Sequence, residues 1–180
     1  KMQDANVDII ECGWLKDKEY EQGSAFYHVP SDLEQYLVNR SSRVTYVAMI
    51  DWDRYNTDVL PTCDGKSLTA VRVVFPHGKH KEGIKVGQKI KDKGYQVYFQ
   101  AANTLSYTNE DLADLAKCMN EFKPVSLSVV DTFGAMFFDD LERIVKFLDA
   151  HLDKNIKLGF HAHNNQQLAF ASTMLFVELL

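Results

Sequence analysis

Cysteine is scarce in this sequence, and no two cysteines stand at a spacing that suggests a metal or redox site. Of 180 residues only Cys12, Cys63 and Cys118 are cysteines. This excludes a C-x-x-C redox pair, a zinc ribbon and an iron–sulfur cluster built on closely spaced thiolates. Three scattered thiols are typical of a reducing compartment, so we expect a cytoplasmic protein.

Long apolar runs and basic tracts are also missing. No stretch approaches the roughly 20 apolar residues of a membrane-spanning helix, and the chain does not open with an export signal, so we expect no membrane association. The 20 Lys and Arg against 25 Asp and Glu give a net charge of -5. That balance argues against nucleic acid as a partner, although a small anionic substrate can still bind locally.

Neither G-x-G-x-x-G nor G-x-x-x-x-G-K-[ST] follows any apolar run. The sequence therefore lacks the phosphate-binding loops that are characteristic of nucleotide-binding folds. What the sequence has is 46% hydrophobic residues, enough to bury a full core. We expect residues 1–180 to form one domain or a large piece of one.

The apolar residues fall into short runs that alternate with helical patterns. The runs show little polar alternation, as expected of strands buried on both faces of a parallel sheet. They are Val7–Glu11, Val44–Ile50, Val71–Phe75, Gln96–Gln100, Ser126–Val130 and Lys157–Phe160. The helical patterns cover 32–37 after an N-cap at Ser31, then 82–93, 108–122, 138–153 and 166–180.

Six β/α units fit either an open doubly wound sheet or most of a (β/α)8 TIM barrel. A complete barrel usually needs about 250 residues. We therefore expect an α/β fold, an incomplete TIM barrel that lacks its first and last strands. Met2–Asn6 is predicted to be the tail of a helix, and the apolar end of the chain predicts a homo-oligomer.

Two histidines at the end of the last strand are the most informative feature. His161 and His163 follow the apolar run Lys157–Phe160, and alternate residues of a strand share one face. A lone histidine is more often a hydrogen-bonded core or surface residue. A pair at a buried strand end, followed by Asn164 and Asn165, favours a divalent-metal site.

Further polar residues follow the other strands, where a barrel keeps its active site. Glu11 and Asp131 are the best carboxylate candidates, whereas Asp51 and Asp53 are more typical of helix caps or loop charges. Arg72 lies inside an apolar strand; it either pairs with Glu11 or Asp131 or holds an anionic substrate. The remaining candidates are Thr132, Gln100 and Asn103. His77, His80, His28 and His151 are expected at the surface.

Three segments together resemble a known family. They are Ile10-Glu11-Cys12-Gly13, Val130-Asp131-Thr132-Phe133-Gly134-Ala135-Met136 and Gly159-Phe160-His161-Ala162-His163-Asn164-Asn165. The resemblance is to the HMG-CoA-lyase-like (DRE-TIM) metal-dependent barrels, which include 4-hydroxy-2-oxovalerate aldolase, HMG-CoA lyase, isopropylmalate synthase and homocitrate synthase. It is strongest to the 4-hydroxy-2-oxovalerate aldolase branch and extends over nearly the whole chain.

The resemblance implies that His161 and His163 are ligands of Mn2+ or Mg2+. It implies that Thr132 contacts a substrate carboxylate, with Asp131, Glu11 and Arg72 as further substrate-binding candidates. Asn164, Asn165, Gln100 and Asn103 would support these groups. The family's third ligand, an aspartate in a first-strand Arg-Asp-Gly motif with a catalytic arginine, has no counterpart in this sequence, and the catalytic residues are not placed.

The resemblance implies a divalent-metal-dependent carbon–carbon lyase or aldolase acting on a small oxo acid or acyl-CoA thioester. Because the first-strand motif is absent, the alternative is a catalytically degenerate barrel that serves as a binding or scaffold module. A metal-dependent hydrolase is a weaker alternative, since such barrels usually carry His-x-His on their first strand.

Overall fold

The computed structural model describes residues 2–180, which group into two compact units. One unit comprises the residues up to 74 together with 85–97, and the other comprises 75–84 together with 98–180. The chain passes between the units within β4 (Ala70–Phe75), within α1 (His80–Asp92) and within β5 (Gln96–Ala101). The single domain predicted from the sequence stays a prediction.

The first unit is built on parallel strands in the order β2-β1-β3-β4. β1 (Ile9–Leu15) pairs with β2 (Phe26–Tyr27) and with β3 (Thr45–Asp51), and β3 pairs with β4. Apolar side chains of β3 and β4 are fully buried, as in sheets covered on both faces. These are Val47, Ala48, Ile50, Val71 and Val73.

The pairing of β1 with β3 is irregular after Glu11. The register of β1 against β3 shifts between Glu11 and Trp14. Gly13 lies there with φ +137°, and a Cβ atom on it would stand 2.2 Å from the carbonyl oxygen of Ala25. Only glycine allows this close approach of two backbone segments, so Gly13 is required for the irregular turn of β1.

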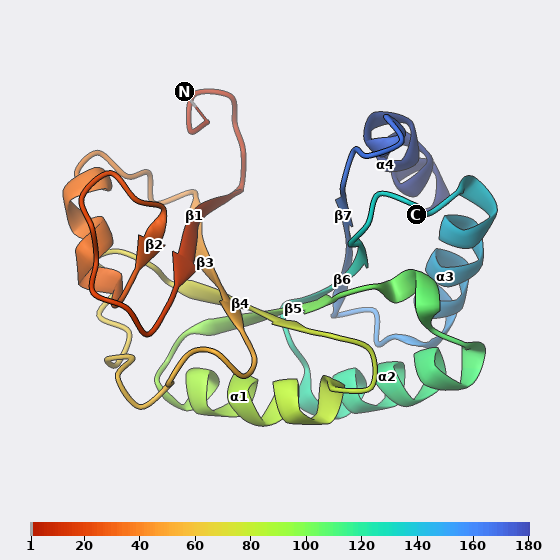
Figure 1. Ribbon diagram of the computed structural model, residues 1–180, viewed down its shortest axis with the longest axis horizontal. Coiled ribbons are helices and arrows are strands. Elements are labelled where there is room, and N and C mark those ends of the chain that lie inside the picture. The colour runs from red at the N-terminus through yellow and green to blue at the C-terminus, as the bar shows by residue number, and fades with distance from the viewer. Residues whose placement is uncertain (1) are drawn as a thin grey trace. The chain divides into compact units, whose positions relative to one another are not determined.

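The second unit contains β5, β6 (Ser126–Asp131) and β7 (Lys157–Ala162), which are parallel and neighbours in chain order. α2 (Asn109–Phe122), α3 (Phe138–His151) and α4 (Ala169–Leu179) alternate with them. α3 packs against α2 and α4, and α4 packs against β7 (Figure 1). Strands that follow chain order, without the reversal of a doubly wound sheet, are typical of a barrel.

α2 shows how local sequence sets the helix positions. The Thr108 hydroxyl accepts a hydrogen bond from the Asp111 amide, and the Asp111 carboxylate accepts one from the Thr108 amide. This reciprocal capping starts the helix. Leu112, Leu115 and Met119 then form a fully buried stripe at helical spacing.

The structure confirms the α/β fold and the six predicted strands as β1 and β3–β7, each shifted by a few residues at most. The helix predicted at Met2–Asn6 is wrong, because these residues form turns. The N-cap at Ser31 is also wrong: the 3-10 helix η1 spans Pro30–Tyr36, and the Asp32 carboxylate accepts the amide hydrogen of Val29 before it. The sequence does not predict β2, because a strand of two residues is too short to give a periodic signal.

Between residues 2 and 180 no helix combines the length and apolar character needed to cross a bilayer. α4 nevertheless exposes several apolar side chains, with Phe170 79% and Val177 63% exposed.

Candidate functional site

The two histidines at the end of β7 lie side by side. His161 is within the strand and His163 follows it, and their ring centroids are 4.9 Å apart. The predicted proximity of the two rings is therefore confirmed.

The hydrogen bond of His163 decides which ring nitrogen can bind a metal. Its Nδ1 lies 2.8 Å from the main-chain carbonyl oxygen of Asp131, on β6. Because a carbonyl only accepts, the neutral ring carries its proton on Nδ1 and keeps a lone pair on Nε2. Metal-binding histidines almost always have such a partner on the other nitrogen, so His163 fits a ligand role.

The loop after β6 is held against the loop after β7. The Asp131 carboxylate, 6% exposed as a residue, accepts hydrogen bonds from the amides of Ala135 at 2.9 Å and Met136 at 3.2 Å. The Asn165 side-chain amide donates to the carbonyl of Phe133 at 2.8 Å. Asp131 thus shapes the loop with its carboxylate while its carbonyl orients His163.

Thr132 lies next in this loop and keeps a proton to donate. Its Oγ1 accepts the main-chain N–H of Asn103 at 2.7 Å. Since the bond uses an oxygen lone pair, the hydroxyl hydrogen of Thr132 remains available for an acceptor such as a carboxylate. Asn103 takes a left-handed conformation, φ 53°, which asparagine tolerates better than most residues.

The other supporting candidates have structural partners. Buried Gln100 donates from Nε2 to the Ser128 hydroxyl at 3.1 Å, and its Oε1 is buried without a hydrogen-bond partner. The Asn164 side chain accepts the Ala169 amide at the start of α4. Neither contact tests a role beside a metal, so those roles stay predictions.

Glu11 and Arg72 belong to the first unit and pair with each other. Arg72 Nη1 lies 2.8 Å from Glu11 Oε2, and the side chains are 23% and 28% exposed. The register explains the contact, because Glu11 aligns with Val47 and Arg72 aligns with Met49, and these two residues of β3 share one face of the sheet. Of the alternatives for Arg72, the structure shows the ion pair with Glu11.

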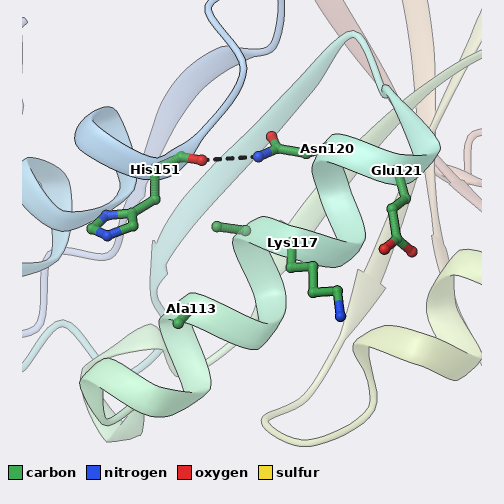
Figure 2. Close-up of a pocket in the computed structure, with 6 residues that line it drawn as sticks. Ala113, Lys117, Asn120, Glu121 and His151 are labelled. Carbon is green, nitrogen blue, oxygen red and sulfur yellow. Dashed lines mark hydrogen bonds between the residues drawn. The ribbon is translucent and has the colours of Figure 1, made fainter.

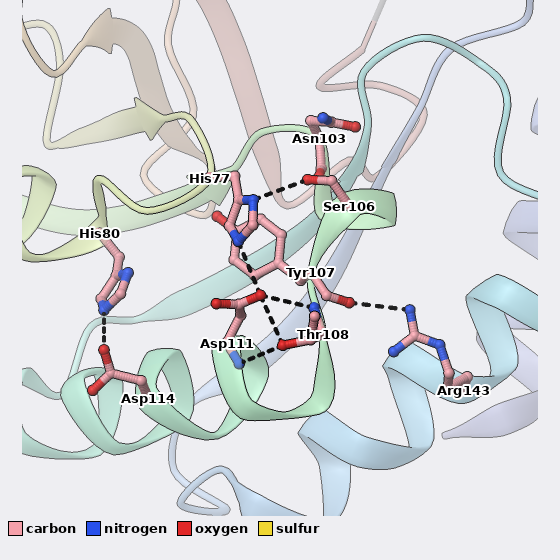
Figure 3. A network of polar contacts seen from close by, with 9 residues as sticks. All are labelled: His77, His80, Asn103, Ser106, Tyr107, Thr108, Asp111, Asp114 and Arg143. Carbon is pink, nitrogen blue, oxygen red and sulfur yellow. Dashed lines mark hydrogen bonds and ion pairs between the residues drawn. The ribbon is translucent and has the colours of Figure 1, made fainter.

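A polar network missed by the sequence analysis follows β4 and β5 (Figure 3). His77 Nε2 lies 3.0 Å from Asp111 Oδ2, and Nδ1 lies 3.3 Å from the Ser106 hydroxyl. The His77 ring packs on Tyr107 at 4.4 Å. Burial raises the pKa of the Tyr107 hydroxyl. No sequence motif signals this network, because His77 follows β4 whereas Ser106, Tyr107 and Asp111 follow β5.

His80 corrects another prediction. It was expected at the surface, but it is 7% exposed and its Nε2 lies 3.0 Å from Asp114 Oδ2. His80 starts α1, and a loop rich in glycine and lysine before it gives no sign of burial. His151, by contrast, is exposed as predicted.

A hollow of about 370 Å³ lies between α2 and α3 (Figure 2). Asn120 spans the two helices there, donating to the His151 carbonyl at 2.9 Å. The hollow is formed by helices, whereas barrel active sites lie at strand ends. It is lined by Ala113, Ala116, Lys117, Asn120, Glu121 and His151.

In the second unit, parallel strands in chain order that alternate with helices and carry a histidine pair at one strand end define a barrel-type α/β protein. The HMGL-like family model matches residues 79–178, and the chain belongs to this family.

A segment of 69 residues, 38% of the chain, is 41% identical to 4-hydroxy-2-oxovalerate aldolase of Thermomicrobium roseum, of which it covers 19%. Among solved structures, the N-terminal domain of a candidate aldolase from Bacteroides vulgatus matches with a TM-score of 0.74 and 17% identity. That match covers 96% of the chain and 57% of that domain. Bacillus subtilis HMG-CoA lyase matches with a TM-score of 0.61 and 16% identity over 78% of the chain and 52% of the lyase. The chain thus spans only part of its relatives.

Proposed function

We propose that the chain is part of the catalytic barrel of a divalent-metal-dependent carbon–carbon lyase or aldolase. The observation that carries the proposal is the pair His161 and His163 at the end of β7, with His163 oriented by the Asp131 carbonyl. Membership of the HMGL-like family supports the reaction class.

His161 and His163 would hold the ion through ring nitrogens, and Nε2 is the nitrogen available on His163. Mn2+ and Mg2+ prefer additional oxygen ligands, and two imidazoles alone would hold either ion weakly. When bound, such an ion stabilises, as a Lewis acid, the negative charge that develops on a carbonyl oxygen as the adjacent carbon–carbon bond breaks.

The chain's own residues would then bind and orient the substrate. The Thr132 hydroxyl can donate to a carboxylate of a 2-oxo acid, since its oxygen already accepts from Asn103. The Asp131 carboxylate keeps the loop in place through the Ala135 and Met136 amides. Fixing the substrate and the loop in one geometry lowers the entropic part of the barrier.

We propose a small oxo acid or acyl thioester as substrate, because two relatives are named for 4-hydroxy-2-oxovalerate and HMG-CoA. Assembly into a homo-oligomer and a cytoplasmic location stay predictions. Sedimentation of the purified protein tests the assembly.

The proposal is tested by Mn2+ titration of the full-length protein, with free Mn2+ read from its electron paramagnetic resonance signal. His161→Ala and His163→Ala are each expected to weaken binding by about tenfold or more. His151→Ala, which changes an exposed histidine on α3, is the matched control and leaves binding unchanged.

Release of pyruvate from 4-hydroxy-2-oxovalerate, and of acetoacetate together with acetyl-CoA from HMG-CoA, then tests the two substrate classes. Unchanged Mn2+ affinity in both histidine variants would overturn the proposal. Intact metal binding without cleavage of either compound would favour the binding or scaffold module instead.

A further inference from the structure

Three potential metal ligands meet on the outer helices of the second unit, apart from the His161 and His163 pair. They are His80 at the start of α1 and Asp114 and Cys118 on α2. One ligand atom from each lies within 4.8 Å of the other two. Among the residues that the structure describes, no other group of three such side chains meets this criterion.

The cluster arises from helix geometry together with one tertiary contact. Asp114 and Cys118 are four residues apart on α2, so they occupy the same face of the helix. His80 is brought onto that face with Nε2 3.0 Å from Asp114 Oδ2. The three ligands therefore come from the first residue of α1 and from one face of α2, and their ligand atoms already lie close together.

The chemistry of the ligand set points to one kind of ion. Imidazole nitrogen, thiolate sulfur and carboxylate oxygen are the ligands of Zn2+, whereas Mg2+ and Mn2+ prefer oxygen and bind thiolate poorly. Zinc bonds of about 2.0 to 2.3 Å place tetrahedral ligand atoms about 3.3 to 3.8 Å apart. The ligand atoms therefore need to approach one another by at most about 1 to 1.5 Å, which rotation of the Asp114 and Cys118 side chains can supply.

The burial of His80 and the cation beside Asp114 both agree with a metal-binding site at this cluster. His80 is 7% exposed and its Nδ1 is buried without a hydrogen-bond partner, so the ring is held by packing and by Asp114. Lys81 Nζ lies 2.8 Å from Asp114 Oδ2 and is 62% exposed, so a flexible cation already occupies the side where a metal would bind.

We propose that His80, Asp114 and Cys118 form a zinc-binding site with water as the fourth ligand, separate from the metal site at the end of β7. Zinc binding replaces the Cys118 thiol proton, which leaves to solvent, and displaces Lys81 from Asp114. The bound ion ties the first turn of α1 to the middle of α2.

The test is a Co2+ titration of the metal-stripped, full-length protein under reducing conditions. Co2+ reports a thiolate ligand directly, through a near-ultraviolet charge-transfer band. We expect one Co2+ per chain with this band, and its loss when Zn2+ is added. Cys118→Ser should abolish the band, while Cys12→Ser and Cys63→Ser, which change the other two thiols, should keep it.

His80→Asn and Asp114→Asn should weaken Co2+ binding by about tenfold or more. Lys81→Met should strengthen it, because it removes the competing cation. Zn2+ should raise the melting temperature of the His161→Ala/His163→Ala variant, but not of the same variant when it also carries Cys118→Ser.

The proposal is overturned if no charge-transfer band forms, or if the band persists in Cys118→Ser. Circular dichroism shows whether each variant is folded. If His80→Asn unfolds, stronger Co2+ binding by Lys81→Met still tests the site. The result does not depend on Mn2+ binding at His161 and His163, so the two metal sites succeed or fail separately.

Discussion

The imidazole of His163 donates from Nδ1 to the main-chain carbonyl of Asp131, 2.8 Å away on the neighbouring strand. Asp131 therefore acts twice: its carbonyl sets the tautomer of His163, and its carboxylate holds the loop that carries Thr132. The geometry of the histidine pair depends on a residue that need not touch a metal.

Replacing Asp131 by alanine should destabilise the protein by about 2 kcal/mol, because the amides of Ala135 and Met136 lose their acceptor. Asp131→Asn, which retains one acceptor oxygen, should lose less. Urea unfolding measures both, with Asp139→Ala, an exposed carboxylate in the first turn of α3, as control. Equal stability of Asp131→Ala and the control would contradict the role given to the carboxylate.

Gly134→Ala should disturb the site as well as the fold. Gly134 has φ +59°, and an added Cβ would lie 2.7 Å from the Asn165 nitrogen and 3.0 Å from the His163 carbonyl oxygen. Gly23 has φ +85° with open space around it. Gly23→Ala should therefore lower the free energy of unfolding only through backbone strain, by about 1 kcal/mol.

We expect Gly134→Ala to cost about 1 to 3 kcal/mol more than this control, by thermal unfolding. It should also weaken Mn2+ binding, because the clash pushes on the backbone of His163. Mn2+ affinity equal to that of Gly23→Ala would show that the loop yields without moving the histidine.

The ion pair of Glu11 and Arg72 should behave as a partly buried unit. Glu11→Leu alone leaves the guanidinium without its carboxylate, and Arg72 Nε is already buried without a partner. We expect a loss of about 2 to 3 kcal/mol for either Glu11→Leu or Arg72→Met, and much of it regained in the double variant. A double-mutant cycle in urea measures the coupling.

Lys79→Met provides the surface comparison, since the pair of Lys79 with Glu82 is 46% and 39% exposed. It should change stability by less than about 0.5 kcal/mol. If the two single variants at Glu11 and Arg72 behave like this one, or their effects simply add, the pair does not act as a unit.

Stability should fall in acid partly through Asp111. The Thr108 amide, then the Thr108 hydroxyl, and more weakly His77 lower the pKa of this carboxyl below its usual 3.8. A depressed carboxyl pKa stabilises the fold above the unfolded-state value, and this contribution disappears as pH falls through the folded-state value.

Unfolding measured between about pH 6 and pH 2 should therefore show a smaller acid-induced loss in Asp111→Asn than in the unsubstituted protein. Glu110→Gln, one residue earlier on α2, is the control and should keep the original pH profile. If the pH profile of Asp111→Asn matches that of the control, protonation of the Asp111 carboxyl does not change the stability of the fold.

The sequence alone determined six of the seven strands that the structure describes, the four α-helices and the histidine pair. Buried parallel strands consist of continuous apolar runs, and amphipathic helices repeat every 3.6 residues, so both are local signals. His161 and His163 could be placed together because alternation along one strand fixes which side chains share a face.

Only the tertiary structure decided the partners of those residues. Glu11 could not be chosen over Asp131 as the partner of Arg72 from sequence, because the choice depends on strand register. The burial of His80 and its meeting with Asp114 and Cys118 likewise depend on a contact between the start of α1 and one face of α2. Such contacts join residues far apart in the chain, where periodicity carries no information about which side chains meet.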